Sequence, residues 1–393
     1  MDLLSHKDRT PIPTISILLD DERRSPFRPG EPVRGTITLH TPTPRTIQHA
    51  EALFFGRTVT HCTRIGEAGN WVGLLGRRNF STNQTIHYHD DASLLRFTQN
   101  LADAVTLEPD RPYSWHFDFV FGDSAKLVGA SPWRGPTTGT GVYAQGLHPL
   151  PPSCDRTFND HHYARVEYFI QAVFYFTDTN AALTAQLPLD FAGNAPWPDP
   201  NSRVEITRPP EIFSSPRLLN DQKSSLRHSL KIGGVDAPSV RVTLKTTVNT
   251  QVIAGSLLPL DVCVELTDFS TSAISIPDVE LRIKSCKLHQ VTFFRAREVR
   301  ARSDPPEYQE IGEDKVSLRS IPEQIASKGD VKPHSTVYSA IFQAEIPARL
   351  APSFRTFNIN HNYQLSGEVV ATICGKKFEQ EFGIENIIMH PRT

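Results

Sequence analysis

Alternation between apolar and polar residues, with a period of two, runs through most of this chain. It is clearest over 33–39, 115–121, 166–174 and 363–373, where every second residue is apolar, aromatic or Gly. A β-strand places successive side chains on opposite faces, so this period is typical of strands that bury one face. Segments with helical periodicity are scarce, and 91–102 is the best helix candidate. The pattern predicts an all-β protein of many short strands rather than a fold of βαβ units.

Two stretches interrupt the alternation and divide the chain. Residues 122–164 are rich in Gly, Pro, Ser and Thr, which predicts a long surface loop. Residues 208–238 contain Pro-Pro and Gly-Gly pairs, which predict an interdomain connection. At 393 residues the chain is long enough for two domains. We expect two tandem immunoglobulin-like β-sandwiches, divided into a polar arm at 1–13, an N-terminal domain at 14–210, a linker at 211–238 and a C-terminal domain at 239–391.

The charge and cysteine content exclude several classes of protein. There are 41 basic and 43 acidic residues, a formal charge of −2, so a nucleic-acid partner is not expected. The five cysteines lie far apart and include no C-x-x-C pair, which argues against a disulfide framework or a structural zinc site. The first residues lack the apolar stretch of a signal peptide, and no run is long enough to span a bilayer. An intracellular protein without a cofactor is expected.

Five segments, in order along the chain, carry more than simple alternation. Residues 27–35 read FRPGEPVRG, in which Gly after Pro predicts a type II turn with a positive φ. Residues 47–56 form an apolar-rich stretch that ends in Gly, and adjacent aromatic residues within it predict a bulge at Phe54-Phe55. Residues 107–119 contain LEP and then FDF, 150–172 contain LPPS and then VEYFIQA, and 352–365 contain PSF, NI and YQL.

In this order the segments resemble motifs of the arrestin family, and specifically of its α-arrestin branch, which is common in fungi. The likeness covers about 15–390, with Pro109 at a position where the family usually has Gly. The resemblance implies an N-terminal and a C-terminal arrestin sandwich that act as a non-catalytic cytosolic adaptor. Such adaptors bind the cytoplasmic tails of membrane-protein cargo, at the plasma membrane or endosomes, and lead it to ubiquitination and endocytosis or sorting. A retromer-like sorting or coat subunit, which shares the double sandwich, is the alternative within the same class.

A PPxY motif at Pro305, Pro306 and Tyr308 is the sharpest functional signal. Two prolines favour a polyproline II segment that fits the aromatic groove of a WW domain, with the tyrosine in the adjacent pocket. In α-arrestins such motifs recruit HECT-type ubiquitin ligases, usually from a long tail after the C-terminal domain. Here the motif lies within the polar stretch 303–315, which we expect to be a loop between strands. The alternative is a chance match in a proline-rich chain.

A basic run precedes this motif, formed by Arg295, Arg297, Arg300 and Arg302. Guanidinium groups suit phosphate and carboxylate, so the run is a candidate site for phosphoinositide head groups or an acidic cargo tail. The alternative interpretation is an edge strand that charge protects against aggregation.

Signals of an enzyme are weak. His87 and His89 point the same way if they lie on a strand, which raises a metal-dependent β-sandwich hydrolase as a second alternative, but no third ligand is identifiable. There is no G-x-S-x-G elbow, no cysteine in a recognisable catalytic setting, and no Lys or following helix to make 135–141 a phosphate-binding loop. We therefore expect no catalytic residues and no bound metal.

Overall fold

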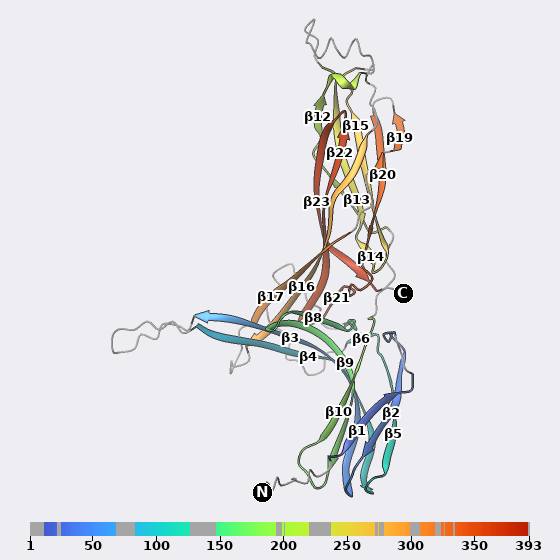
Figure 1. The fold of residues 1–393 in the computed structure, drawn as a ribbon, viewed down its shortest axis with the longest axis vertical. Helices are drawn as coiled ribbons and strands as arrows, with labels where there is room; N and C mark the ends of the chain where they lie inside the picture. The colour runs from blue at the N-terminus through green and yellow to red at the C-terminus, as the bar shows by residue number, and fades with distance from the viewer. Residues whose placement is uncertain are drawn as a thin grey trace, which may run out of the picture. The chain divides into compact units, whose positions relative to one another are not determined.

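The protein is all-β, as the alternation predicts (Figure 1). The computed structural model describes residues 12–21, 25–67, 83–125, 147–193, 199, 201–219, 237–271, 274, 279–298, 307–318, 324–325, 327–332 and 335–391. Within these ranges, strands make up nearly all the regular structure, and the one helical element is a single 3-10 turn, η1 (Pro216–Leu218).

The chain forms two compact units that share segments of sequence. Unit 1 comprises 1–194 together with 292–311 and 354–360, and unit 2 comprises 195–291, 312–353 and 361–393. This division differs from the predicted one. Two strands, β11 (Arg203–Thr207) and β12 (Glu211–Ser214), fall within the expected N-terminal domain and linker but pair with β13 (Ser239–Asn249) in unit 2. The boundary is set by the backbone pairing of β11 and β12 with β13. The composition of the linker gives no information about such pairing.

Unit 1 contains two packed sheets. The first has the order β1-β2-β5, and the second has the order β10-β9-β3-β4 with β8 on β9. Their bounds are β1 (Thr14–Leu19), β2 (Pro32–His40), β3 (Arg45–Glu67), β4 (Asn83–Leu107), β5 (Pro112–Val120), β8 (Cys154–Asn159), β9 (His162–Phe176) and β10 (Leu183–Leu189). Strand β6 (Ser124–Ala125) pairs antiparallel with β7 (His148–Pro149). Alternate aromatic residues fill the core, where Phe121 stacks on Phe191 at 4.4 Å and packs edge-on against Phe54 at 4.7 Å.

Unit 2 is built in the same way. One sheet has the order β11-β13-β15-β20-β19, with β12 also on β13, and the other contains β16-β22-β23-β14. The bounds not yet given are β14 (Gln251–Ile253), β15 (Leu257–Thr267), β16 (Glu280–Glu298), β17 (Glu307–Ser317), β18 (Gln324–Ile325), β19 (Ser327–Lys332), β20 (Ser335–Glu345), β21 (Phe354–Arg355), β22 (Ile359–Ile373) and β23 (Lys376–His390). Along β15 every second residue is buried, so the alternation in the sequence matches the two faces of the sheet.

The strand order of the two units corresponds. The sheet β1-β2-β5 of unit 1 has its counterpart in β13-β15-β20 of unit 2, and β3-β9-β10 corresponds to β16-β22-β23. Two of these strands also cross the boundary, since the last residues of β16 and the first of β22 belong to unit 1. In unit 1 the end of β16 pairs with β4, where Arg297 lies opposite His89.

One hydrogen-bonded motif is repeated in both units. In unit 1 the Phe191 N–H donates to Ser153 Oγ at 2.9 Å, and the Tyr168 hydroxyl donates to the Pro151 carbonyl at 2.7 Å. In unit 2 the Met389 N–H donates to Ser353 Oγ at 2.9 Å, and the Tyr363 hydroxyl donates to the Ala351 carbonyl at 2.6 Å. Each serine N–H also donates to the carbonyl of the same partner, at 2.8 Å in both units. The LPPS and LAPS segments therefore make the same hydrogen bonds in unit 1 and unit 2.

Several local predictions were wrong. The segment 91–102, the best helix candidate in the sequence, is part of β4, because pairing with β3 overrides a weak helical pattern. The loop expected at 122–164 contains β8, which pairs with β9, while 126–146 lie outside the described residues. The loop expected at 303–315 contains most of β17, which pairs with β16.

The turn prediction is confirmed, whereas the register shifts of β3 lie at other residues than the predicted bulge. Gly30 has a φ of 79°, as a type II turn requires. The β3–β4 register shifts at Ala50/Glu51 and Gly56/Arg57 rather than at Phe54-Phe55. Phe54 is fully buried, whereas Phe55 is only partly buried and packs against Phe169 on β9.

Candidate functional site

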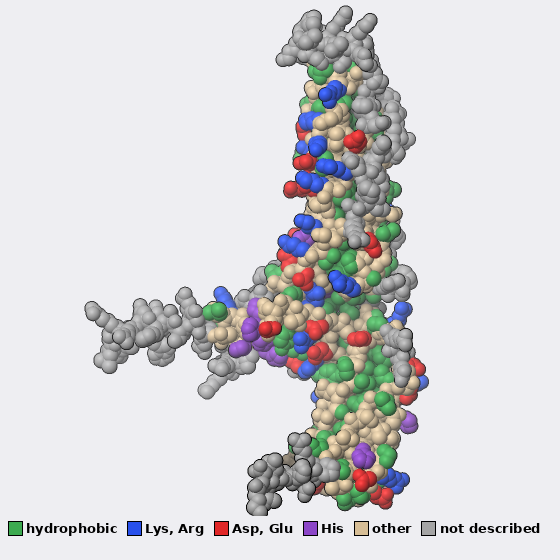
Figure 2. All heavy atoms as spheres, viewed as in Figure 1, with side chains coloured by type: hydrophobic (Ala, Val, Ile, Leu, Met, Phe, Trp, Pro, Cys, Tyr) green, Lys and Arg blue, Asp and Glu red, His purple; other side chains and the backbone are tan. Residues whose placement is uncertain are grey.

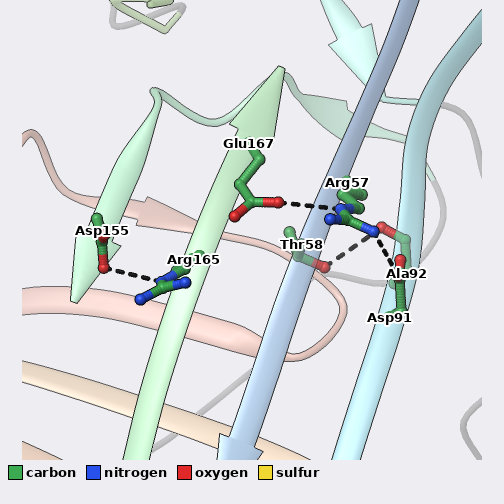
Figure 3. Close-up of polar contacts among 7 residues, drawn as sticks. All are labelled: Arg57, Thr58, Asp91, Ala92, Asp155, Arg165 and Glu167. Carbon is green, nitrogen blue, oxygen red and sulfur yellow. Dashed lines mark hydrogen bonds and ion pairs between the residues drawn. The ribbon is translucent and has the colours of Figure 1, made fainter. Parts of the chain in front are cut away.

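The outer face of β8, β9, β3 and β4 in unit 1 carries a row of ion pairs (Figure 3). Arg57 is on β3, which lies between β9 and β4. Its Nε is 3.0 Å from Glu167 on β9, and an Nη is 3.1 Å from Asp91 on β4. Beside it, Arg165 Nε lies 3.1 Å from Asp155 on β8. These side chains are partly exposed, so each pair adds little to stability, but together they set the charge of this face.

Histidines gather on the same face, next to the ion pairs (Figure 2). We call the set His61, His87, His89 and His161 the histidine face. His61 on β3 is central, because its ring centroid lies 5.8 Å from that of His87 and 6.4 Å from that of His89, both on β4. Tyr163 on β9 stacks on His61 at 5.2 Å. The prediction that His87 and His89 point the same way is confirmed by these contacts and by strand β4.

A buried acid lies under this face. Asp90 follows His89 on β4 and points to the opposite side of the strand, where its Oδ2 is buried without a hydrogen-bond partner. Burial raises the pKa of the Asp90 carboxyl, against the opposing attraction of Arg297 and then Arg295. The two arginines of the basic run that the structure describes are therefore close enough to act on this carboxylate.

Arg295 is not available for an external ligand. Its side chain is only 5% exposed, and it donates to the carbonyl oxygen of Phe357. Its own carbonyl accepts a 2.7 Å hydrogen bond from Thr60 on β3, and its N–H donates to the Asn358 carbonyl at 3.0 Å. The proposed role of Arg295 in binding phosphate or an acidic tail is corrected, because the residue is part of a buried polar cluster in unit 1. The end of β16 pairs on one side with β4, where Arg297 lies opposite His89 and Glu298 opposite Tyr88.

The other residues of the basic run and the PPxY motif are described only in part. Arg297 is half-buried at the end of β16, opposite His89. Arg300, Arg302, Pro305 and Pro306 lie outside the described residues, and the backbone of Tyr308 belongs to β17. The structure thus brings one arginine of the run, Arg297, together with the histidine pair that the metal hypothesis used.

A metal site at these histidines would need a third ligand beside His87 and His89. The parts of the chain that the structure describes contain no group of three or more His, Cys, Asp or Glu side chains arranged to hold a metal ion. His61 lies beside this pair, and its Nδ1 donates to the His161 carbonyl at 2.9 Å, which orients the ring and leaves Nε2 as its second nitrogen.

A serine, a histidine and a glutamate meet on the outer face of unit 2. His289 on β16 lies 2.6 Å from Glu313 on β17 through Nδ1 and 2.8 Å from Ser366 Oγ on β22 through Nε2. Because a carboxylate only accepts, Nδ1 carries the proton and Nε2 accepts from the serine hydroxyl. The hydrogen bond from His289 lowers the pKa of Glu313. Sequence reasoning missed this cluster, because its members are far apart in the chain and none lies in a catalytic motif.

Comparisons with known proteins leave the family undecided. No protein-family model matches the chain, and no curated protein matches its sequence. Across the described ranges, no helix is long and apolar enough to cross a membrane.

One residue of the unit 1 site, His61, gave no usable signal in the sequence. It is an isolated histidine 26 residues before His87, whereas Asp90 directly follows the His87 and His89 pair that the metal hypothesis used. Only the β3–β4 register, which places His61 opposite His89, brings them into one site.

Proposed function

We propose that this protein is a non-catalytic adaptor of the arrestin type, which binds the cytoplasmic tails of membrane-protein cargo. The observation that carries the proposal is the motif repeated at Ser153 with Tyr168 and at Ser353 with Tyr363. It falls on the LPPS, VEYFIQA, PSF and YQL segments, which are among those on which the arrestin resemblance rests. The corresponding strand order of the two units supports the same proposal.

Sorting or ubiquitination of the cargo is the second part of the proposal. The PPxY motif would supply the contact to a WW-domain HECT ubiquitin ligase, and Arg297 a contact to an acidic tail or to anionic phosphoinositides at the plasma membrane or an endosome. An adaptor needs binding surfaces rather than a reactive centre. The exposed sheet faces of the two units can supply such surfaces.

Cargo binding is tested by pull-down of the full-length protein on immobilised cytoplasmic tails of membrane proteins. We expect a subset of tails to retain it, and Arg297→Glu to weaken that retention. The matched control is Arg34→Glu, since Arg34 is an exposed arginine of unit 1 on β2, in another sheet. If no tail retains the protein, or if it is isolated only as a stoichiometric member of a large coat complex, the adaptor proposal is overturned in favour of a coat subunit.

Ligase recruitment is tested with an isolated WW domain. We expect Tyr308→Ala and Pro305→Ala each to abolish binding, because both remove a group that the WW groove contacts. Glu307→Ala is the control, because it changes the variable position of the motif and should bind as the wild type does. Equal affinity of all four proteins means that the motif is not used.

Serine-dependent acyl transfer is a second candidate function, favoured by the Ser366–His289–Glu313 hydrogen bonds. Ser366 lies opposite Gly383, beside which a side chain would meet only open space, so an ester could approach. Ser366 Oγ would bond to the ester carbonyl carbon as the alcohol leaves, with the serine proton passing through His289 Nε2 to the leaving oxygen. Water would then release the acid by the reverse proton path.

This candidate is tested with a fluorophosphonate probe and mass spectrometry of the labelled peptide. Labelling of Ser366 that is lost in His289→Gln supports it, with Ser339→Ala, on β20, as the control. Labelling that is absent, or that does not depend on His289, overturns it.

A further inference from the structure

The four imidazoles of the histidine face lie close together, so a proton taken up by any of them adds positive charge to the same surface. His61 donates through Nδ1 to the His161 carbonyl, so Nε2 is the nitrogen that takes up a proton. His87, His89 and His161 are exposed, and His61 is half-buried between them and Tyr163. Histidine is the side chain whose charge changes between about pH 5 and 8, so this surface changes its charge within that interval.

The remaining charges around these histidines nearly cancel. On the same face Arg57 is shared by Asp91 and Glu167, and Arg165 is paired with Asp155. Among the described residues, the other charged neighbours are Arg297, opposite His89, and Asp160 in the turn before His161; the buried Asp90 lies on the other side of β4. With arginines and acids close to balance, the protonation of the histidines decides whether the surface is near neutral or strongly positive.

Protonation of His61 is opposed by its own surroundings. Burial lowers the pKa of His61, and the neighbouring His87, His89 and His161 lower it further, while the hydrogen bond to the His161 carbonyl opposes this. A negatively charged group bound here would relieve the repulsion among the protonated rings. By linkage, such a ligand binds more tightly as protons bind, and the histidines hold protons more tightly when the ligand is present.

The spacing of the rings suits an extended peptide. His87 and His89 are two residues apart on one strand, which is the spacing of alternate side chains in any extended chain, about 6.5–7 Å. A peptide with an acid at every second position can therefore match both rings. Asp91 and Glu167 lie on the same face beside Arg57, and they disfavour a continuous anionic bilayer more than a narrow peptide.

We propose that the histidine face, together with Arg297, is a docking surface for an Asp- or Glu-rich peptide segment that binds more tightly as the pH falls. The inference rests on the proposed adaptor function only in that the segment is taken to belong to a cargo tail. It adds a binding surface, the histidine face, and a proton dependence to that function.

The test measures binding of a fluorescent peptide of alternating Glu and Gly to the full-length protein. From about pH 7.5 to about pH 5.5 we expect the affinity to rise roughly tenfold, because several histidines gain charge in this interval. The same peptide with Gln in place of Glu should bind weakly at both pH values. On adding the Glu peptide, the midpoint of the His61 imidazole titration, followed by NMR, should move to higher pH.

Variants separate the histidines from the arginine. His87→Gln with His89→Gln should remove the pH dependence, and Arg297→Gln should weaken binding at both pH values while the dependence remains. His40→Gln, an exposed histidine on β2, is the control and should behave as the wild type does. Because His87 and His89 are exposed, these variants should fold.

Three outcomes overturn the inference. The first is peptide binding that is equal at both pH values or unchanged in the double histidine variant. The second is a pH response that disappears on adding EDTA, which assigns the surface to a metal ion. The third is binding to phosphatidylserine vesicles but not to the peptide. If cargo tails are still captured by the double histidine variant at all pH values, the adaptor function stands and only this inference fails.

Discussion

Gly56 on β3 shows how one residue is chosen by packing against a neighbouring strand. A Cβ built at this position would lie 2.6 Å from two ring atoms of Tyr168 and 3.1 Å from Leu95 Cγ. Tyr168 is fully buried and held by its hydrogen bond to Pro151, so the ring has little freedom to move away. Glycine is required here by close contact rather than by a special backbone conformation.

We expect Gly56→Ala to lower the free energy of unfolding by about 1–3 kcal/mol, as overpacking of a close-packed core does. Gly383→Ala is the matched control, because a Cβ there meets no atom within 4 Å and glycine is a poor strand residue. Urea denaturation of the three proteins measures both effects. A Gly56→Ala protein as stable as the wild type contradicts the packing of Tyr168 against β3.

Asp90 gives a prediction on pH. Its pKa is raised in the folded protein, so the folded state binds this proton more tightly than the unfolded chain does. The contribution of Asp90 to the free energy of unfolding therefore becomes more favourable as the pH falls through the folded-state value. Asp90→Asn has no such proton, so we expect the wild type to gain stability relative to Asp90→Asn between about pH 7.5 and about pH 5.

Comparing the two proteins isolates this residue. His61, whose lowered pKa costs stability as the pH falls, is present in both and cancels from the difference. Urea unfolding at the two pH values supplies the measurement. A wild type that loses stability relative to Asp90→Asn on acidification would show that Arg295 and Arg297 outweigh burial and keep Asp90 ionised.

Strand β16 shows what a single element contributes beyond its own unit. Its early residues pair with β22 in unit 2, and its last residues lie in unit 1. There Phe294 is fully buried and its ring is parallel to that of Phe158 on β8, with centroids 5.8 Å apart. Arg295 follows and joins the buried polar cluster with Thr60 and Asn358.

We expect Phe294→Ala to destabilise the protein by about 3–5 kcal/mol, because removing the buried ring leaves a cavity. Hydrogen exchange should rise in β8 and in 354–360, which contact this end of β16. Phe55→Ala is a control, since Phe55 is aromatic but only partly buried. A loss of protection confined to unit 2 would contradict the place of Phe294 in unit 1.

Elements with regular alternation were predictable, and those without it were not. Strands β2, β5, β9 and β22 follow the sequence pattern because each has one face in a core. In contrast β8 and β17 are polar, and only their hydrogen bonds to β9 and β16 make them strands. A strand that forms through hydrogen bonds to its partner, without burying one face, shows no alternation of apolar and polar residues in the sequence.

At the scale of the whole chain, unit 1 contains segments from the second half of the sequence, so the first half alone lacks part of this unit. Unit 1 uses 292–311 and 354–360, which supply Phe294, Arg295 and Phe357 to its interior. His148 packs edge-on against Phe357 at 4.7 Å, so removing that segment exposes its buried neighbours. The division into units is therefore not a division into separable pieces of sequence.

We expect a fragment of residues 1–194 to lack a cooperative unfolding transition, whereas the full-length chain has one. Circular dichroism on heating and limited proteolysis measure this. Adding the separate fragment 195–393 should restore protection from protease if the shared segments are what is missing. A stable fragment 1–194 would contradict the dependence of unit 1 on those segments.

The sequence by itself determined that the chain is all-β, where the regular strands lie and that Gly30 forms a turn. These properties depend on neighbours a few residues apart, through the period of a strand and the sterics of a turn. Tertiary structure alone decided that Arg295 is buried, that His61 joins His87 and His89, and that Ser366 meets His289. Each of these contacts joins strands that are distant in the chain, and their register depends on the fit of whole sheets, which local patterns do not encode.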